Sequence, residues 1–455
     1  MNDRYFSGLT GEVVTSQDPE YQKDRQEWNR AIQKYPLIIV YCYHKLDVSN
    51  AVLWSEQHCV PLRIRSGGHN YEGYSTGNSV LIIDVSRMKA ISIHENTVTV
   101  EGGVSNRELY EYVSSKGYPF PGGTCPTVGL SGYALGGGWG LSCRRFGLGC
   151  DSLVELELVD YKGKILTASS ECNPDLFWAC RGGGGGSFGV IVSMTFRLPP
   201  KISRVTFVEV YYQNTVEERR AQFLTTWQRW LAQADERITL IASIYHSQEE
   251  GYAIYLRGIF YGASQEARII MEPFTDLEEN EASMEEMSFW EAVTIIGNSY
   301  PSSQMFKSTG RFVIRPFNES EVYRVTSLLE EVPQGSVYSA LTLYALGGKV
   351  KEKSSRETAF FYRDAGYIIG IQSVWTNPAY EHSNVDWVNR QFRYLKSVTE
   401  GSYVNFPYSG LRDYLDAYYG LNAGRLREIK DQYDPDNIFQ FPQSIIPFYT
   451  GPHCH

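Results

Sequence analysis

Runs of apolar residues divide residues 1–200 into short strands and helices. Short apolar runs bounded by turn residues are typical of buried strands, and apolar residues spaced three and four apart indicate helices. Residues 192–198 alternate apolar and polar side chains, which predicts a half-buried strand. The remaining pattern predicts strands at 37–41, 61–65, 80–85, 97–100, 153–159 and 164–167, and helices at 18–31, 48–56 and 106–115.

The pattern changes after Pro199-Pro200. The segments that follow are longer and alternate, with helical stretches between them, which favours an antiparallel sheet covered by helices on one face. Thr215 and Glu218 have the spacing of a helix capping box, and an apolar stripe from Phe223 to Leu231 follows them. Further strands are predicted at 206–212, 238–245, 252–261, 337–344 and 367–375, and further helices at 266–271, 319–329 and 385–395.

The last 55 residues contain one further predicted helix. Leu426, Ile429 and Tyr433 share one face of a predicted helix. Asp434-Pro435 ends this helix because a residue before proline avoids the α conformation. We therefore predict an α+β protein with a boundary at Pro199-Pro200.

Composition and charge narrow the classes of partner. The net charge of the 455 residues is −10, which argues against nucleic acid or an anionic membrane surface. The chain shows no apolar leader and no apolar run of about 18 residues. We therefore expect no transmembrane segment, and a protein that is cytoplasmic or exported without a classical signal peptide. The eight cysteines and eight histidines show no metal-ligand spacing, so no metal site is predicted.

Glycine-rich segments carry the candidate chemistry. Residues 65–74 read RSGGHNYEGY and residues 122–140 read GGTCPTVGLSGYALGGGWG. Each holds one nucleophile, His69 or Cys125. Glycine lets the backbone turn sharply and approach a ligand closely, and successive N–H groups in such a turn favour anions. A third segment, RGGGGGSFGV at 181–190, leads directly into the alternating strand, so it belongs inside a domain and is not a linker.

Together the first two segments resemble the flavin-binding signature of the vanillyl-alcohol oxidase/p-cresol methylhydroxylase (PCMH) superfamily, and within it the berberine-bridge-enzyme-like branch. In that branch the histidine of R-S-G-G-H bonds to the 8α carbon of FAD, and the cysteine of G-T-C-P-x-V-G bonds to C6. The resemblance implies covalent FAD, 8α-histidyl through His69 and 6-S-cysteinyl through Cys125. Residues 403–445 resemble the branch's C-terminal element, and 181–190 resemble its third flavin-contacting segment, with Ser187 in place of the usual asparagine.

The resemblance also implies which residues contact the cofactor, with the pyrophosphate at the 66–69 loop. The implied contacts are Arg65, Ser66, Gly67, Gly68, His69, Asn70, Ser75, Cys125, Val128, Gly129, Gly132, Gly138, Trp139, Gly140, Gly186, Gly189, Val190, Tyr403 and Asn405.

The positions where the branch usually carries its catalytic base hold different residues here. Relatives that oxidise sugars usually carry tyrosine at the position of Phe406, and several carry tyrosine at that of Trp139. Neither residue present here can accept a proton from an alcohol. Gln372 stands where alkaloid-cyclising members have a glutamate base, and an amide can orient a hydroxyl without taking its proton. We predict Tyr408 acting with Gln372, turned inward by Pro407. The other catalytic-site candidates are Tyr403, Tyr344, Tyr71 and Trp139, with Arg363 as a cation that would favour a tyrosinate.

The resemblance implies a PCMH-type FAD-binding domain (1–200), a substrate-binding domain (201–400) and a C-terminal segment (401–455) that returns to the FAD domain. It implies an oxidase that passes hydride from an alcohol or hemiacetal, such as a mono- or oligosaccharide, to flavin N5, with molecular oxygen as acceptor. Two alternatives stay open. One is oxidative tailoring of a secondary metabolite, which the missing hydroxyls favour; the other is a flavin-loaded spore-coat or structural protein with vestigial activity. The oligomeric state is left open.

Overall fold

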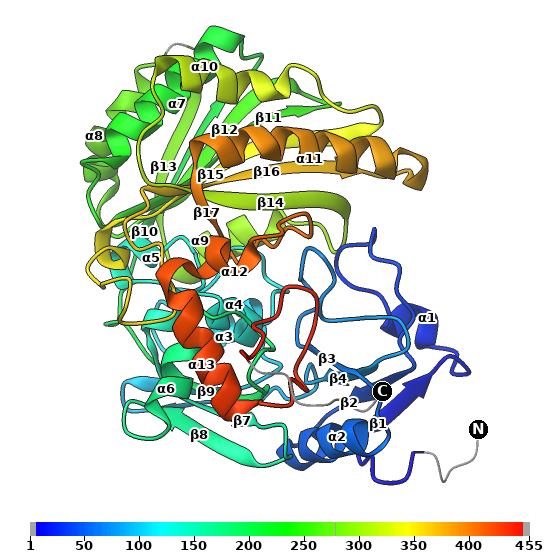
Figure 1. Ribbon diagram of the computed structural model, residues 1–455. Helices are drawn as coiled ribbons and strands as arrows, with labels where there is room; N and C mark the ends of the chain where they lie inside the picture. Colours follow the sequence, from blue (N-terminus) through cyan, green and yellow to red (C-terminus); the bar gives the residue numbers. More distant parts are fainter. Residues whose placement is uncertain (1–5, 278, 449–455) are drawn as a thin grey trace.

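The computed structural model describes residues 6–277 and 279–448, which form two lobes (Figure 1). The lower lobe contains two sheets. In the first, β2 (Ile38–Tyr41), β4 (Leu81–Asp84) and β3 (Leu62–Arg65) are parallel and β1 (Glu12–Thr15) is antiparallel at the edge. The second is antiparallel, in the order β5 (Ile91–His94), β6 (Thr97–Glu101), β9 (Val190–Arg197), β7 (Leu153–Val159), β8 (Ile165–Ser169). Helices of this lobe include α2 (Lys45–Gln57), α3 (Asn106–Ser114), α4 (Leu130–Leu135), α5 (Cys143–Phe146) and α6 (Pro174–Ala179).

The helix predicted at 18–31 is wrong over most of its length. Only α1 (Tyr21–Asp24) is helical, because the backbone after it bonds to other segments. Trp28 N donates to Gly68 O (3.0 Å), and Arg30 N donates to Gln304 O (2.7 Å). This N-terminal segment therefore ties the His69 loop to the upper lobe.

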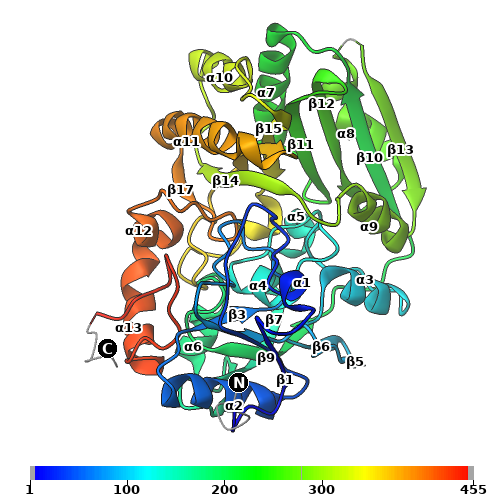
Figure 2. The same cartoon turned by 90° about the vertical axis from the view of Figure 1, so that its right-hand side faces the viewer.

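The upper lobe is one antiparallel sheet of eight strands with helices on one face, which confirms the predicted arrangement (Figures 1 and 2). The strand order is β13 (Glu281–Met287), β10 (Val205–Tyr212), β12 (Gly251–Phe260), β11 (Ile238–Ser247), β15 (Ser336–Ala345), β16 (Tyr367–Trp375), β14 (Met305–Val313), β17 (Glu400–Ser402). The covering helices are α7 (Glu217–Leu231), α8 (Ser264–Thr275), α10 (Glu319–Thr326) and α11 (Glu381–Val398).

The capping box expected at the start of α7 is wrong. The residue before the helix is Val216, and it makes no side-chain capping bond. Thr215 lies one position too early, and its buried hydroxyl finds no partner among the described residues.

The other face of the eight-stranded sheet packs on the lower lobe. Phe312 and Ile368 from the sheet share a core with Tyr133 and Trp139, and α9 (Phe289–Asn298) packs there too. Side chains alternate along a strand, so Leu343 and Ile371 enter the helix-covered core whereas their neighbours Tyr344 and Gln372 face the lower lobe.

The C-terminal residues run back from the upper to the lower lobe (red in Figure 1). After β17 come α12 (Tyr414–Tyr419) and the predicted helix, α13 (Ala423–Tyr433), in which Leu426 and Ile429 are buried and Tyr433 is half-buried. The buried Lys430 ammonium bonds Asp434 and the carbonyls of Ser187 (2.6 Å) and Phe439 (2.9 Å), which fastens the third glycine-rich segment to α13. Single 3₁₀ turns are η1 (Gly149–Asp151), η2 (Ser327–Leu329), η3 (Gly348–Val350), η4 (Pro378–Tyr380) and η5 (Gly420–Asn422).

The domain boundaries near 200 and 400 stay a prediction. Within the described part of the chain, no helix has the length and apolar character needed to cross a membrane. Across those same residues, no group of three or more His, Cys, Asp or Glu side chains is placed to hold a metal ion.

Candidate active site

Two glycine-rich loops cross in direct backbone contact. A Cβ on Gly67 would lie 2.3 Å from Gly129 N, and a Cβ on Gly129 would lie 2.4 Å from Ser66 Oγ. A larger residue at either position would therefore push the loops apart. At this crossing, His69 and Cys125 both contact the hydroxyl of Thr127.

A cavity of about 350 Å³, lined by both lobes, lies beside these loops. Its size falls in the range of small-molecule and cofactor sites. Gly132 and Gly185 leave open space there, because a Cβ on either would meet no atom closer than 3.7 Å. Among the described residues that line the cavity, Arg63 and His69 are the basic side chains and none is a carboxylate.

The imidazole of His69 is held by two neighbours. Its ring stacks on Trp28, with 5.1 Å between centroids and 26° between planes. Its Nε2 lies 2.8 Å from Thr127 Oγ1. Burial lowers the pKa of His69 to about 4, so the ring is neutral at physiological pH and keeps a lone pair on one nitrogen. A neutral imidazole of this kind can act as a nucleophile.

Cys125 is the second nucleophile of the site. Its Sγ lies 3.7 Å from Thr127 Oγ1, and burial raises the pKa of its thiol. Asn106, the first residue of α3, donates Nδ2–H to the Cys125 carbonyl (3.2 Å) and accepts a bond from Gly123 N (3.3 Å). The start of α3 therefore fixes the position of the cysteine loop.

Most residues implied as cofactor contacts line the cavity. They are Ser66, Gly67, Gly68, His69, Asn70, Ser75, Cys125, Val128, Gly129, Gly132, Trp139, Gly186, Gly189, Tyr403 and Asn405.

Arg65, Gly138, Gly140 and Val190 do not line the cavity, and their contact with the cofactor stays a prediction. Arg65 pairs with buried Asp84 (2.5 Å). Gly138 donates its N–H to the Tyr403 hydroxyl (3.0 Å). A Cβ on Gly140 would lie 1.8 Å from the Gly122 carbonyl oxygen, and Val190 begins β9 with its side chain in the lower core.

An aromatic wall, defined as Tyr71, Trp139, Phe306, Tyr344 and Phe406, lines part of the cavity. Tyr71 meets Phe306 edge-on at 5.0 Å between centroids. Tyr344 contacts Phe406 at 5.1 Å and Trp139 at 4.8 Å. Burial raises the pKa of Tyr71 and of Tyr344 far above the ordinary value, so both phenols stay protonated at neutral pH. They can hydrogen-bond a substrate hydroxyl but are weak candidates for a general base.

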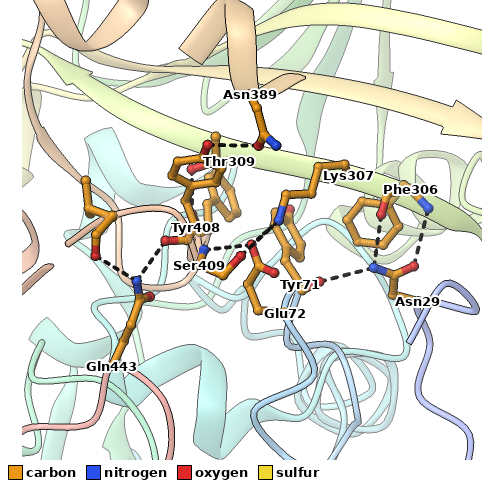
Figure 3. Close-up of polar contacts among 12 residues, drawn as sticks. Asn29, Tyr71, Glu72, Phe306, Lys307, Thr309, Asn389, Tyr408, Ser409 and Gln443 are labelled. Atoms are coloured by element: carbon orange, nitrogen blue, oxygen red, sulfur yellow. Dashed lines mark hydrogen bonds and ion pairs between the residues drawn. The ribbon is translucent and has the colours of Figure 1, made fainter. Parts of the chain in front are cut away.

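Tyr408 does not line the cavity, which corrects its assignment as the base. Its hydroxyl donates to Asn389 Oδ1 on α11 (2.8 Å; Figure 3). The chain turns twice around Pro407: Phe406 N donates to Tyr403 O (2.9 Å), and Leu411 N donates to Tyr408 O (3.1 Å). The turns direct the phenol towards α11.

The structure places the remaining residues considered for catalysis, Tyr403, Gln372 and Arg363, in three different settings. Tyr403 lines the cavity, but its hydroxyl accepts N–H bonds from Gly138 and Trp139 (3.0 and 3.2 Å), so it supports the second glycine loop. Gln372 reaches the cavity from β16, and its amide makes no hydrogen bond to any described residue. Arg363 lies outside the cavity lining in a buried pair with Asp151 (2.7 Å), so its expected role beside a tyrosine is wrong.

Asn29 and Glu72 were missed by the sequence reasoning, and they hold Tyr71 from both sides (Figure 3). Asn29 Nδ2 donates to the carbonyls of Tyr71 and Phe306 (both 3.1 Å), and its Oδ1 accepts from Phe306 N (3.3 Å). Glu72 accepts bonds from Lys307 Nζ on β14 and from Ser409 N (2.9 Å). No motif marks these residues, and they bond Phe306, Lys307 and Ser409, which lie more than 200 positions away in the chain.

The residues of the cavity fit FAD. His69 and Cys125 supply two nucleophiles at one edge. Backbone from three glycine-rich segments borders the space, and backbone N–H groups with a nearby cation favour a pyrophosphate. The absence of carboxylates from the described lining agrees with an anionic ligand. The aromatic wall leaves room for a substrate beside it.

Comparisons with known proteins also indicate an FAD-binding protein. Residues 36–169 match the family model described as FAD binding domain, and residues 402–446 match the model described as Berberine and berberine like. The uncharacterized FAD-linked oxidoreductase YgaK of Bacillus subtilis (strain 168) is 38% identical, over 96% of this chain and 97% of its own. The monolignol oxidoreductase AtBBE-like 13 of Arabidopsis thaliana is 30% identical, over 88% of this chain and 82% of its own.

Solved structures share the whole fold. BBE-like 1 of Physcomitrella patens superposes with a TM-score of 0.89 at 26% identity, covering 99% of each chain. Glucooligosaccharide oxidase from Acremonium strictum superposes with a TM-score of 0.88 at 21% identity, covering 96% of this chain and 97% of its own, and shows similarity of fold alone. The fold and the cavity therefore define an FAD-linked oxidoreductase. More specifically, the chain belongs to the berberine bridge enzyme-like family.

Proposed function

We propose that this enzyme carries FAD bonded to both His69 and Cys125 and oxidises a neutral alcohol or hemiacetal, such as a mono- or oligosaccharide, with molecular oxygen as acceptor. Bound FAD would supply the hydride-accepting N5. The crossing of the two glycine loops carries the proposal, because it sets both nucleophiles beside one cavity. The FAD of the similar glucooligosaccharide oxidase is described as 6-S-cysteinyl, 8α-N1-histidyl.

The polar groups of the cavity support a neutral substrate. Tyr71, Tyr344 and Gln372 offer two phenols and an amide to a substrate hydroxyl. A cationic substrate would find no carboxylate among the described lining residues. In this proposal the three side chains orient the carbon–hydrogen bond that breaks, and the surrounding aromatic rings exclude water.

The alternative substrate is a secondary metabolite that undergoes oxidative tailoring. Phe406 favours it, because the wall has an apolar ring where sugar-oxidising relatives usually have a phenol. The similarity to a monolignol oxidoreductase also supports an aromatic alcohol as substrate.

An oxygen electrode tests the reaction. Purified enzyme is offered a panel of mono- and oligosaccharides and a panel of aromatic primary alcohols, and flavin reduction is followed without oxygen in parallel. We expect oxygen uptake with one panel. Reduction without oxygen uptake would contradict oxygen as the acceptor. If no member of either panel reduces the flavin, both proposed substrate classes are contradicted.

Acid precipitation tests the two bonds. The precipitated wild-type chain should stay yellow, and its intact mass should exceed the chain mass by one FAD. His69→Ala and Cys125→Ala should each keep the flavin through the other bond, whereas the double variant should release it. A colourless wild-type precipitate would contradict covalent attachment.

A further inference from the structure

Thr127 contacts both nucleophiles but does not line the cavity. Its Oγ1 lies 2.8 Å from His69 Nε2 and 3.7 Å from Cys125 Sγ. Its side chain is exposed, whereas His69 and Cys125 are partly buried and border the cavity. One hydroxyl therefore links the two nucleophiles on the solvent side of the site.

This contact occupies one of the two ring nitrogens of His69. Nε2 lies 2.8 Å from the hydroxyl, and the Thr127 backbone also hydrogen-bonds the ring, which opposes the effect of burial on the pKa of His69. A neutral imidazole carries one proton, and its other nitrogen has a free lone pair. When the proton is on Nε2 it is donated to Thr127, and Nδ1 is the nucleophile. The stacked ring of Trp28 holds the imidazole plane while this happens.

The Cys125 sulfur requires a hydrogen-bond donor, whereas His69 requires an acceptor for its Nε2 proton. Only the thiolate is nucleophilic, and burial disfavours it by raising the pKa of Cys125. The Thr127 hydroxyl opposes this effect, because a hydrogen bond donated to the sulfur stabilises the thiolate. A hydroxyl has one proton to donate and lone pairs to accept, so it can serve both partners at once.

We propose that Thr127 is a positioning residue for covalent flavin attachment, an inference that rests on the proposed bonds to His69 and Cys125. Its hydroxyl accepts a hydrogen bond from Nε2–H of His69, which leaves the lone pair on Nδ1 for attack, and it donates a hydrogen bond to Cys125 Sγ. Because Thr127 is exposed, water can take the protons that attachment releases.

The atoms and electrons balance with dioxygen as oxidant. At His69 a bond forms between Nδ1 and C8α, while the Nε2 proton and one hydrogen of the 8α methyl group leave. At Cys125 a bond forms between Sγ and C6, while the thiol proton and the C6 hydrogen leave. Each bond passes two electrons to the flavin and then to one dioxygen, which becomes hydrogen peroxide. Thr127 ends unchanged.

Two substitutions separate the hydroxyl from the shape of Thr127. Thr127→Val keeps the branched shape without a hydroxyl, and Thr127→Ser keeps the hydroxyl. Each is combined with Cys125→Ala to follow the histidyl bond and with His69→Ala to follow the cysteinyl bond. Full-length protein is expressed under limiting riboflavin, riboflavin is restored, and the covalent fraction is followed by intact mass.

We expect Thr127→Val to slow the formation of both covalent bonds by about tenfold, which is the effect of losing one hydrogen bond of typical strength. Thr127→Ser should attach flavin at close to the wild-type rate. In the His69→Ala background, Thr127→Val should also move cysteinyl attachment to higher pH, because the thiolate has lost a donor. A merely structural role would slow the serine and valine variants alike and leave this pH dependence in place.

The outcomes separate this inference from the proposed function. If the wild type carries both bonds and Thr127→Val forms them equally fast, the role of Thr127 is overturned while bicovalent FAD stands. If the wild type itself releases flavin on denaturation, the proposed attachment fails, and the role of Thr127 fails with it.

Discussion

The rings of Tyr71 and Phe406 lie parallel, with 5.3 Å between their centroids and 3° between their planes. Tyr71 follows the His69 loop, and Phe406 belongs to the C-terminal segment, so the pair joins distant parts of the chain on the cavity wall. Because Phe406 has no hydroxyl, this pair offers a substrate one phenol where a tyrosine pair would offer two.

Phe406→Tyr should therefore improve the reaction with sugars. We expect flavin reduction by a sugar to accelerate by about tenfold, below the 10²-fold scale of a full general base, because the buried new phenol would stay protonated. Stopped-flow measurement without oxygen gives the rate. Phe441→Tyr, elsewhere on the cavity lining, is the control. An unchanged rate with sugars but a lower rate with aromatic alcohols would favour the tailoring reaction.

The raised pKa values of the wall phenols predict the pH dependence of the reaction. A phenol whose pKa is raised stays protonated to higher pH, so Tyr71 and Tyr344 should act only as hydrogen-bond donors at neutral pH. The rate of flavin reduction by an alcohol should therefore show no titration of these phenols between about pH 6 and about pH 9. An increase in this rate with an apparent pKa in that range would show that another group takes the proton.

Local motifs made part of this site predictable. His69 and Cys125 each sit in a loop whose glycines are required for the backbone crossing, so the sequence signals the geometry directly. The covered antiparallel sheet was also predictable, because its alternation is repeated over long strands. Arg65 lies within the first motif yet turns to Asp84, because a buried guanidinium requires a carboxylate partner.

Contacts between distant segments were not predictable. Alternation along an extended strand could not place Tyr408, because two turns around Pro407 redirect its side chain to Asn389. The segment around Trp28 and Asn29 has helical spacing, but pairing with Gln304 and Gly68 overrides its local preference. Such pairings depend on tertiary contacts that leave no local pattern.

The Glu72–Lys307 ion pair should hold the aromatic wall together. Both side chains are about one-tenth exposed, and they follow Tyr71 and Phe306 directly in sequence. Lys307→Met leaves the carboxylate partly buried without its cation, and we expect a loss of about 3 kcal/mol in the free energy of unfolding. KM should rise more than kcat falls, because the wall binds substrate. Lys396→Met, which removes an exposed pair with Asp413, is the control and should cost less than about 1 kcal/mol.

Lys430 should stabilise the third glycine-rich segment. Its ammonium and the Asp434 carboxylate are fully buried, and Lys430 also bonds the Ser187 carbonyl. Lys430→Met should cost about 3–5 kcal/mol in denaturant unfolding of the holoenzyme, because it leaves Asp434 uncompensated. Limited proteolysis should cleave first near 181–190. Equal unfolding of this variant and Lys396→Met would contradict the role of Lys430.

Tyr408→Phe and Tyr71→Phe should have opposite effects. The Tyr408 hydroxyl bonds Asn389 outside the cavity, so its removal should cost about 1 kcal/mol of stability and leave the rate of flavin reduction unchanged. The Tyr71 hydroxyl belongs to the cavity wall and makes no hydrogen bond to any described residue, so its removal should leave stability nearly unchanged. It should slow flavin reduction by about tenfold through the loss of one substrate hydrogen bond. Denaturant unfolding and stopped-flow reduction of both variants give the comparison. A slow Tyr408→Phe with a fast Tyr71→Phe would place the reacting hydroxyl on the α11 side and overturn the cavity assignment.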